Sequence, residues 1–356
     1  MMRPVSIDGA PAPNVALGKR IGAAIVWVCS VAVWVVVSSC ATPGPVARLR
    51  TDSHPPGLRV SGRHLYDADG NRVVPIGANV MTKYWDPGGW RSISALAQTG
   101  ANTVRIFWKI EPSTGLDAFE RNIRNAVEHG MFAMPSLWEA TGQWSQLERC
   151  VDWWVQPEVL EIISRYERHL LLNIANEAGD ASVSMRQFES GYRRAITRLR
   201  EAGIRVPLVI DAANWGRDES YILQTATALI AHDPERNLLF SWHPWDDRMP
   251  RSRYTETIDA AVAQEIPLII GEFSHTGVFY NSTHDWRFLV EYATEHDIGW
   301  LAWVWRGADV SDGHNITTNY LYGNWTPWGA QVVELIERYA VRGPGTSQGR
   351  TPESRP

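Results

Sequence analysis

Two glutamates stand directly after very apolar segments of the sequence. Glu177 ends the segment LLNIANE, and Glu272 ends the segment LIIGE. Two opposed carboxyl groups can cleave a glycosidic bond, because one protonates the leaving oxygen while the other attacks the anomeric carbon or activates water. We therefore take Glu177 and Glu272 as the candidate catalytic pair, and ask which elements would place them opposite each other.

Short apolar runs alternate with amphipathic helical patterns along most of the chain. The runs cover residues 74–79, 103–108, 131–137, 170–175, 206–211, 238–242, 267–271 and 298–304. Continuous apolar strands that alternate with helices indicate a parallel sheet covered on both sides. Eight such units predict a (β/α)8 barrel over residues 57–341. A doubly wound open sheet is the alternative, but the first run lacks the glycine-rich phosphate turn that such a sheet would favour.

Residues 58–60 and 72–74 flank an Asp-Gly turn at 67–71, which predicts an N-terminal β-hairpin that caps the barrel. The active site of a (β/α)8 barrel lies at the carboxyl ends of its strands, where the fourth and seventh strands are roughly opposite. Polar and aromatic side chains toward the ends of the runs, or just after them, are therefore candidate substrate-binding residues. They are Arg105, Trp138, Asn176, His243, Trp245 and Trp305.

The composition is that of a globular protein, with 44% hydrophobic and 21% charged residues. The net charge of −5 and the absence of a basic block argue against a nucleic-acid partner. The 18 tryptophans indicate either a bulky core or flat amphipathic ligands such as sugar rings. No cluster of His, Cys, Asp or Glu has metal-ligand spacing, so we expect neither a metal nor a cofactor. We expect a monomer.

The N-terminus has the pattern of an export signal. Residues 21–39 carry no charge and follow Lys19-Arg20, and the run ends in VSSC with Cys40 as its last residue. This ending resembles a bacterial lipobox, in which Cys40 would be lipidated. The alternatives are an uncleaved membrane anchor and plain secretion. All three place the barrel outside the cytoplasm, in the first two cases attached to a membrane of the cell envelope. Residues 41–56 read as a tether and 342–356 as a disordered tail.

A set of motifs in a fixed order resembles glycoside hydrolase family 5, and within it the bacterial endo-β-1,4-mannanase branch. The motifs are GAN at 77–79, TGANTVRI at 99–106, EATG at 139–142, NIANE at 173–177, DAANWG at 211–216, GEF at 271–273 and WLAWVW at 300–305. The resemblance implies a retaining (β/α)8 enzyme. It makes Glu177 the acid/base and Glu272 the nucleophile, supported by Arg105 and Asn176.

The same resemblance places His243 in the polar network of the site and makes Trp305 a sugar platform. The chain departs from the family pattern at two positions. Trp138 stands where members usually carry a histidine, and Trp245 stands where they usually carry a tyrosine that holds the nucleophile. We therefore expect hydrolysis of a β-1,4-linked polysaccharide or oligosaccharide, with mannan ahead of glucan. The alternatives are a β-glucanase of the same mechanism and a catalytically weak, carbohydrate-binding surface lipoprotein.

Overall fold

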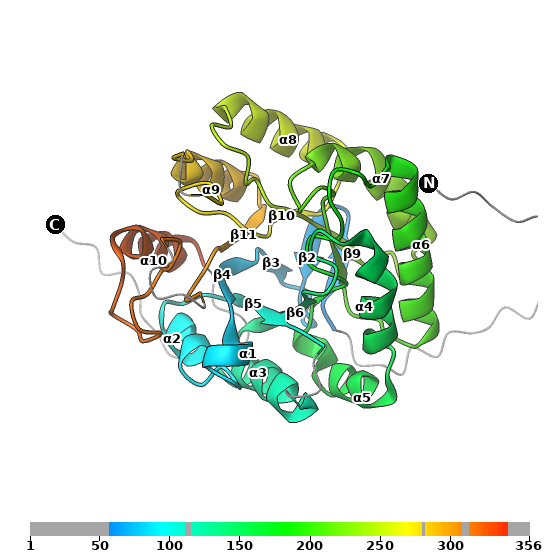
Figure 1. Ribbon diagram of the computed structural model, residues 1–356, viewed down its shortest axis with the longest axis horizontal. Coiled ribbons are helices and arrows are strands. Elements are labelled where there is room, and N and C mark those ends of the chain that lie inside the picture. The colour runs from blue at the N-terminus through cyan, green and yellow to red at the C-terminus, as the bar shows by residue number, and fades with distance from the viewer. Residues whose placement is uncertain (1–56, 111–114, 280–281, 308–312, 341–356) are drawn as a thin grey trace, which may run out of the picture. The chain divides into compact units, whose positions relative to one another are not determined.

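Eight parallel strands close into a barrel in the order β4 to β11, and helices surround it (Figure 1). The computed structural model describes residues 57–110, 115–279, 282–307 and 313–340, so the predicted leader, tether and tail lie outside the described residues. The barrel strands are β4 (Ile76–Val80), β5 (Thr103–Trp108), β6 (Phe132–Leu137), β7 (Leu172–Asn173), β8 (Leu208–Asp211), β9 (Leu238–Trp242), β10 (Leu268–Ile270) and β11 (Gly299–Ala302). The predicted (β/α)8 barrel is confirmed.

The helices follow the strands in alternation, as the amphipathic patterns predict. They are α1 (Thr82–Trp85), α2 (Ser92–Gln98), α3 (Leu116–Glu128), α4 (Leu147–Trp154), α5 (Pro157–Tyr166), α6 (Met185–Glu201), α7 (Glu219–His232), α8 (Arg251–Ala263), α9 (Trp286–Glu295) and α10 (Pro327–Tyr339), with 3-10 turns at Trp144–Gln146 and Glu167–His169. Within the described ranges, none of these helices combines the length and the hydropathy that a membrane span requires.

The barrel interior has an apolar layer toward the amino ends of the strands and a polar layer toward their carboxyl ends. Alternate residues of a strand point to the same side, so residues two apart share the interior. The apolar layer includes Met134, Val209, Leu239, Ile269 and Leu301. Two residues further along three of these strands come Ser136, Asp211 and Ser241, all fully buried. The inward-facing residues of these strands thus change from apolar to polar over two positions, which places the polar network at the carboxyl-terminal end of the barrel.

A small antiparallel sheet packs against the apolar layer. Its strands are β1 (Arg59–Ser61), β2 (His64–Tyr66) and β3 (Arg72–Val73), with β2 in the middle. Leu58, Leu65 and Val73 belong to the same apolar cluster as the lower barrel residues, and in Figure 1 β2 and β3 lie behind the barrel strands. The predicted cap is therefore present. Its hairpin joins β3 to β2 rather than to residues 58–60, because the chain makes an additional tight reversal at residues 62–63.

Candidate active site

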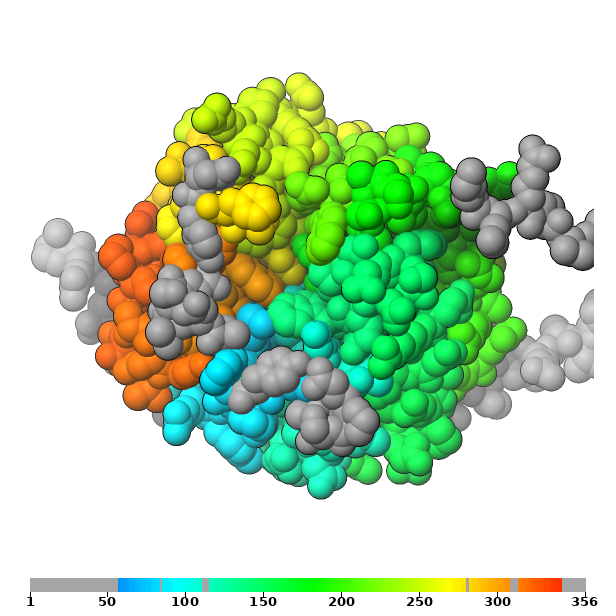
Figure 2. Space-filling view, in the orientation of Figure 1, coloured from blue at the N-terminus to red at the C-terminus, as the bar shows by residue number. Residues whose placement is uncertain are grey.

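A cavity of about 600 Å³ opens beside the carboxyl ends of the barrel strands. Figure 2 shows the face of the molecule at that end, where segments from distant parts of the sequence surround the centre. The residues that line the cavity are Trp138, Thr141, Asn176, Glu177, Trp215, Arg217, Trp245, Glu272, Val278, Phe279, Trp303 and His314. Both candidate glutamates are among them, and most of the remaining wall is aromatic. A sugar ring is amphipathic, so such a wall suits its apolar face while the carboxyl groups reach its oxygen atoms.

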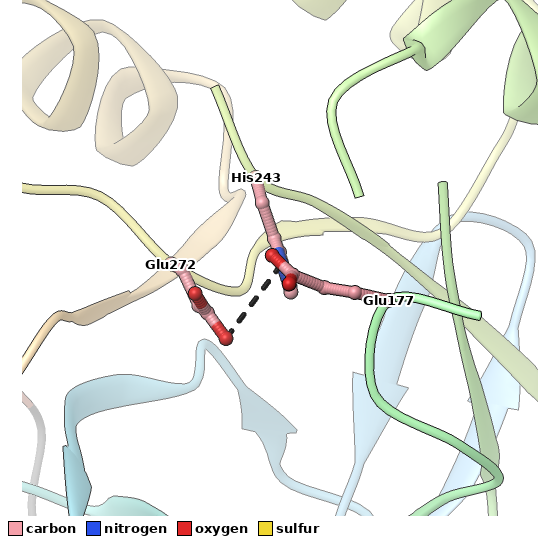
Figure 3. A group of neighbouring side chains, drawn as sticks. All are labelled: Glu177, His243 and Glu272. Carbon is pink, nitrogen blue, oxygen red and sulfur yellow. Dashed lines mark hydrogen bonds and ion pairs between the residues drawn. The ribbon is translucent and has the colours of Figure 1, made fainter. Parts of the chain in front are cut away.

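Glu177 and Glu272 converge with His243 on one point of this cavity (Figure 3). One carboxylate oxygen of each glutamate and one ring nitrogen of His243 all lie within 4.8 Å of one another. His243 Nδ1 is 2.9 Å from Glu177 Oε1 and 3.7 Å from Glu272 Oε1. The two glutamates come from the ends of β7 and β10, so the barrel brings together residues that are 95 positions apart in the sequence.

Arg105, on β5, is the central cation of the site. Its guanidinium donates to Glu272 Oε1 at 2.6 Å, to Asn176 Oδ1 at 2.6 Å and to Asp211 Oδ2 at 3.1 Å. The side chain has no exposed surface. A buried guanidinium requires carboxylate partners, and its planar set of donors fixes their geometry. Arg105 therefore orients Glu272 and joins it to the element that carries Glu177.

Further amides and hydroxyls hold Arg105 and Asn176 in place. Asn79 Oδ1 accepts from Arg105 at 3.0 Å, while the Asn79 amide N–H donates to the carbonyl of Gly271, next to Glu272. The Asn176 amide donates to Thr141 Oγ1 at 2.9 Å. An asparagine amide has two N–H groups, so one can go to Thr141 while the other serves a sugar hydroxyl.

The backbone of Glu177 is in the left-handed region, with φ at 44°. A residue other than glycine pays about 1–3 kcal/mol for such a conformation, and it persists only where the surroundings enforce it. The Glu177 N–H donates to Asp211 Oδ2 at 2.9 Å, and its carbonyl accepts from the N–H of Gly142 at 3.0 Å. Asp211 thus supports both Arg105 and the Glu177 backbone. The sequence placed Asp211 at a strand end, but gave no indication of this supporting role.

His243 lies in a slot between two glycines. A Cβ at Gly216 would be 2.6 Å from its Nδ1, and a Cβ at Gly271 would be 2.7 Å from its Nε2. The Nε2 side faces Ser241 Oγ at 3.0 Å and Asp211 Oδ1 at 3.6 Å. This arrangement favours a proton on Nε2, which leaves Nδ1 as an acceptor for a protonated Glu177.

Charge balance explains the protonation of the pair. Burial and Arg105 hold the pKa of His243 well below its usual value, so the ring is neutral and adds no positive charge. The buried carboxyl groups of Glu177, Asp211 and Glu272 therefore share the single positive charge of Arg105. Burial, followed by the negative charges of Glu272 and Asp211, raises the pKa of Glu177 well above its usual range. Burial also raises the pKa of Glu272 to about 7, although the Arg105 cation opposes that rise. Glu177 is therefore the group that keeps its proton, and Glu272 is the one that ionises first.

Two of the three predicted aromatic contacts line the cavity. Trp138 does so and packs edge-on against Phe107, with ring centroids 4.4 Å apart. Trp245 also lines it and donates its indole N–H to Glu272 Oε2 at 3.2 Å. Trp305 is instead fully buried, and its N–H donates to the carbonyl of Tyr320. Trp303, two residues earlier in the chain, lines the cavity in place of Trp305, which was predicted to be the sugar platform.

Other cavity residues come from loops that the sequence analysis did not single out. Trp215 is 41% exposed and Phe279 is 80% exposed, and both border the cavity. Arg217, on the same loop as Trp215, pairs with Asp246 at 3.4 Å. Trp215 belongs to the segment DAANWG, which begins at the last residue of β8, so its place just past a strand end was a usable signal. Phe279 lies far beyond the end of β10, where no periodicity fixes the path of the chain.

A metal ion could fit between the side chains of Glu177, His243 and Glu272, because an oxygen or nitrogen atom of each lies close to those of the other two. Arg105 nevertheless already contacts Glu272, and its guanidinium occupies the position from which a cation would balance that carboxylate. The same oxygen atoms are those that acid–base and nucleophilic chemistry at a sugar would use. We therefore assign these donors to that chemistry and assign no metal to the site.

Comparison with known proteins agrees with this geometry. The sequence profile of cellulase (glycosyl hydrolase family 5) matches residues 66–309. The chain belongs to glycoside hydrolase family 5. It is therefore a glycoside hydrolase of a retaining family. An oxygen of Glu177 lies within 4.8 Å of an oxygen of Glu272, which fits the short spacing of the carboxyl pair in retaining enzymes.

Several relatives of this family 5 chain are mannanases. It is 31% identical over 294 residues to a mannan endo-1,4-beta-mannosidase of Salipaludibacillus agaradhaerens, covering 78% of this chain and 91% of the relative. It is 27% identical to a mannan endo-1,4-beta-mannosidase of Cellvibrio japonicus, covering 78% of this chain and 66% of the relative. The mannohexaose complex of the Thermomonospora fusca beta-mannanase superposes with a TM-score of 0.71 at 27% identity, covering 81% of this chain and 96% of that one.

Proposed function

We propose that this chain is an endo-β-1,4-mannanase, with Glu272 as the nucleophile and Glu177 as the acid/base. The observation that carries the proposal is the pair itself. The two carboxyl groups face each other across a cavity walled by tryptophans, and only one of them is paired directly with Arg105. The mannan-specific part rests on the activity for which the relatives are named, and the chain is similar to them over about three quarters of its length.

In the first step, an ionised Glu272 oxygen bonds to the anomeric carbon as the glycosidic C–O bond breaks. The electron pair of that bond goes to the leaving oxygen, which takes the proton of Glu177. Glu177 can hold this proton at neutral pH because burial and the charges of Glu272 and Asp211 raise its pKa. Arg105 and the Trp245 N–H hold the attacking carboxylate in position.

In the second step, Glu177 acts as a base. Glu272 is now an ester and carries no charge, so one of the causes that raised the pKa of Glu177 is gone. Glu177 can then remain ionised until a water molecule gives it a proton and attacks the anomeric carbon. The ester bond to Glu272 breaks, and the sugar leaves with the configuration at its anomeric carbon unchanged.

The polymer specificity is tested by reducing-end release from the full-length chain in detergent. We expect turnover on mannan and glucomannan, with a fall in mannan viscosity well ahead of reducing-end release, as internal cleavage requires. Cellulose and mixed-linkage glucan serve as the comparison polymers. Faster turnover on these glucans than on mannan would replace the proposal by a β-glucanase of the same mechanism. Sugar binding without turnover on any polymer would support the weak carbohydrate-binding lipoprotein instead.

We also propose that the enzyme is exported and held at a membrane of the cell envelope by a lipid on Cys40. The support is the sequence pattern around residues 21–40. The wild-type chain should incorporate labelled palmitate, and Cys40→Ser should lose that label. A wild-type chain that takes up no label would instead indicate an uncleaved anchor or plain secretion.

A further inference from the structure

The carboxylate of Glu272 is held at both of its oxygen atoms by donors from different elements. Arg105 on β5 donates to Oε1 at 2.6 Å, and the Trp245 indole, three residues after β9, donates to Oε2 at 3.2 Å. A carboxylate with a donor on one oxygen can tilt about that hydrogen bond, and its second oxygen is then free to move. A carboxylate with a separate donor on each oxygen must break one bond to rotate, so the two donors together fix its plane.

Trp245 is itself held rigidly. Its backbone N–H donates to the carbonyl of His243 at 2.8 Å, across Pro244. Its ring packs against His314 with centroids 5.4 Å apart, and His314 Nε2 lies 2.9 Å from Thr276 Oγ1. The side chain is 7% exposed. The indole therefore has little freedom to turn away from Glu272.

We infer that Trp245 is a positioning residue, whose indole N–H aims the Glu272 carboxylate at the anomeric carbon and favours its ionised form. This inference rests on the proposed role of Glu272 as the nucleophile. An indole N–H only donates, and it neither accepts a hydrogen bond nor titrates in the range in which proteins are stable. Trp245 can therefore stabilise the charge on Glu272 at every working pH, and it cannot remove a proton from any group in the site.

Charged and titratable groups face Glu272 from several surrounding elements. They are Arg105 on β5, Glu177 after β7, Asp211 on β8 and His243 after β9. Arg105 and Trp245 lower the pKa of Glu272, whereas burial and Asp211 raise it. Removal of the Trp245 donor leaves the other four groups in place. The pKa of Glu272 should then rise, and activity on the acid side should be lost at a higher pH.

The test uses Trp245→Phe and Trp245→Tyr in the full-length chain, with an aryl β-mannobioside whose leaving group ionises easily. A hydrogen bond to a charged group contributes enough that Trp245→Phe should lower kcat/KM by about 10- to 100-fold. Its acid limb in the profile of kcat/KM against pH should move to higher pH. Trp245→Tyr restores an O–H donor on a ring of similar bulk, so it should recover much of the rate and keep its acid limb close to that of the wild type.

Trp303→Phe is the matched control, because Trp303 lines the same cavity and, among the described residues, donates no hydrogen bond to Glu272. It should raise KM for the substrate and leave the acid limb where it is. An unshifted acid limb in Trp245→Phe, or an equal shift in Trp245→Phe and Trp245→Tyr, would overturn the inference. A Glu272→Ala variant that retained activity would instead refute the role of Glu272, and so separates failure of the proposed function from failure of this inference. Thermal unfolding of each variant shows whether the barrel is intact.

Discussion

Glu272→Ala should abolish turnover, lowering kcat on every substrate by at least about 10⁴-fold. The physical reason is that no other carboxylate can take its place. Asp211 is fully buried and already supports Arg105 and the Glu177 backbone, and Glu177 is the proton donor. The measurement is release of the aryl group from an activated β-mannobioside, which needs no acid catalyst and so reports on the nucleophile alone.

The stereochemistry of an azide reaction tests the same role. Azide is small enough to enter the space left by the missing carboxylate and attack the anomeric carbon once, so Glu272→Ala should form a glycosyl azide of inverted configuration. Glu189→Ala is the control, because Glu189 lies on the outer side of α6 and its ion-pair partner among the described residues is Arg193, one turn along that helix. Its activity should match the wild type. A retained azide product from Glu272→Ala would contradict the assignment.

Glu177→Ala should have an effect that depends on the leaving group. Removal of a general acid costs about 10²- to 10⁴-fold on mannan, where the departing sugar oxygen needs a proton. On the activated aryl substrate the first step should remain fast, and the ester on Glu272 should accumulate because its hydrolysis lacks a base. Stopped-flow measurement should therefore show a burst of aryl alcohol followed by slow turnover. Absence of the burst, with equal losses on both substrates, would contradict a role as acid/base.

The pH profile of Glu177→Ala is a second readout. In the wild type, Glu177 must be protonated for the first step, so activity on mannan falls as the pH rises through its raised pKa. The variant has no such group, and the alkaline limb of kcat/KM should disappear. Azide should speed its second step and give a product of retained configuration, because azide then attacks the glycosyl ester and inverts the centre a second time.

Much of the barrel and of the catalytic pair could be predicted from the sequence, because both follow from short-range alternation. The segments before Glu177 and Glu272 are apolar strands, and the carboxyl end of each strand of a barrel lies at one face. The aromatic wall was harder to predict. Leu301 belongs to the apolar layer, so its inward partner two residues on is Trp303, whereas the distance from the strand end had favoured Trp305. The alternation of inward and outward side chains along the strand was therefore a better predictor of the cavity residue than the position of the strand end.

Residues on long loops could not be placed from the sequence by any such rule. Phe279 and His314 reach the cavity through segments between β10 and α9 and between β11 and α10, whose paths depend on tertiary packing rather than on local pattern. The same holds for the Trp245 contact. The sequence showed an indole in place of a phenol, but only the turn across Pro244 and the packing on His314 bring its N–H to Glu272.

The two glycines that flank His243 have a consequence for how the site can change. Gly216 and Gly271 carry no functional group, yet the His243 ring lies so close to both that a Cβ at either position would overlap it. A single methyl group at either position would displace the ring whose Nδ1 accepts the hydrogen bond of protonated Glu177. In a randomised library aimed at new substrate preferences, these two codons would therefore be as intolerant as those of the glutamates, while the exposed Trp215 and Phe279 would be free to vary. Catalysis in this chain therefore depends on two positions at which no side chain larger than that of glycine fits beside His243.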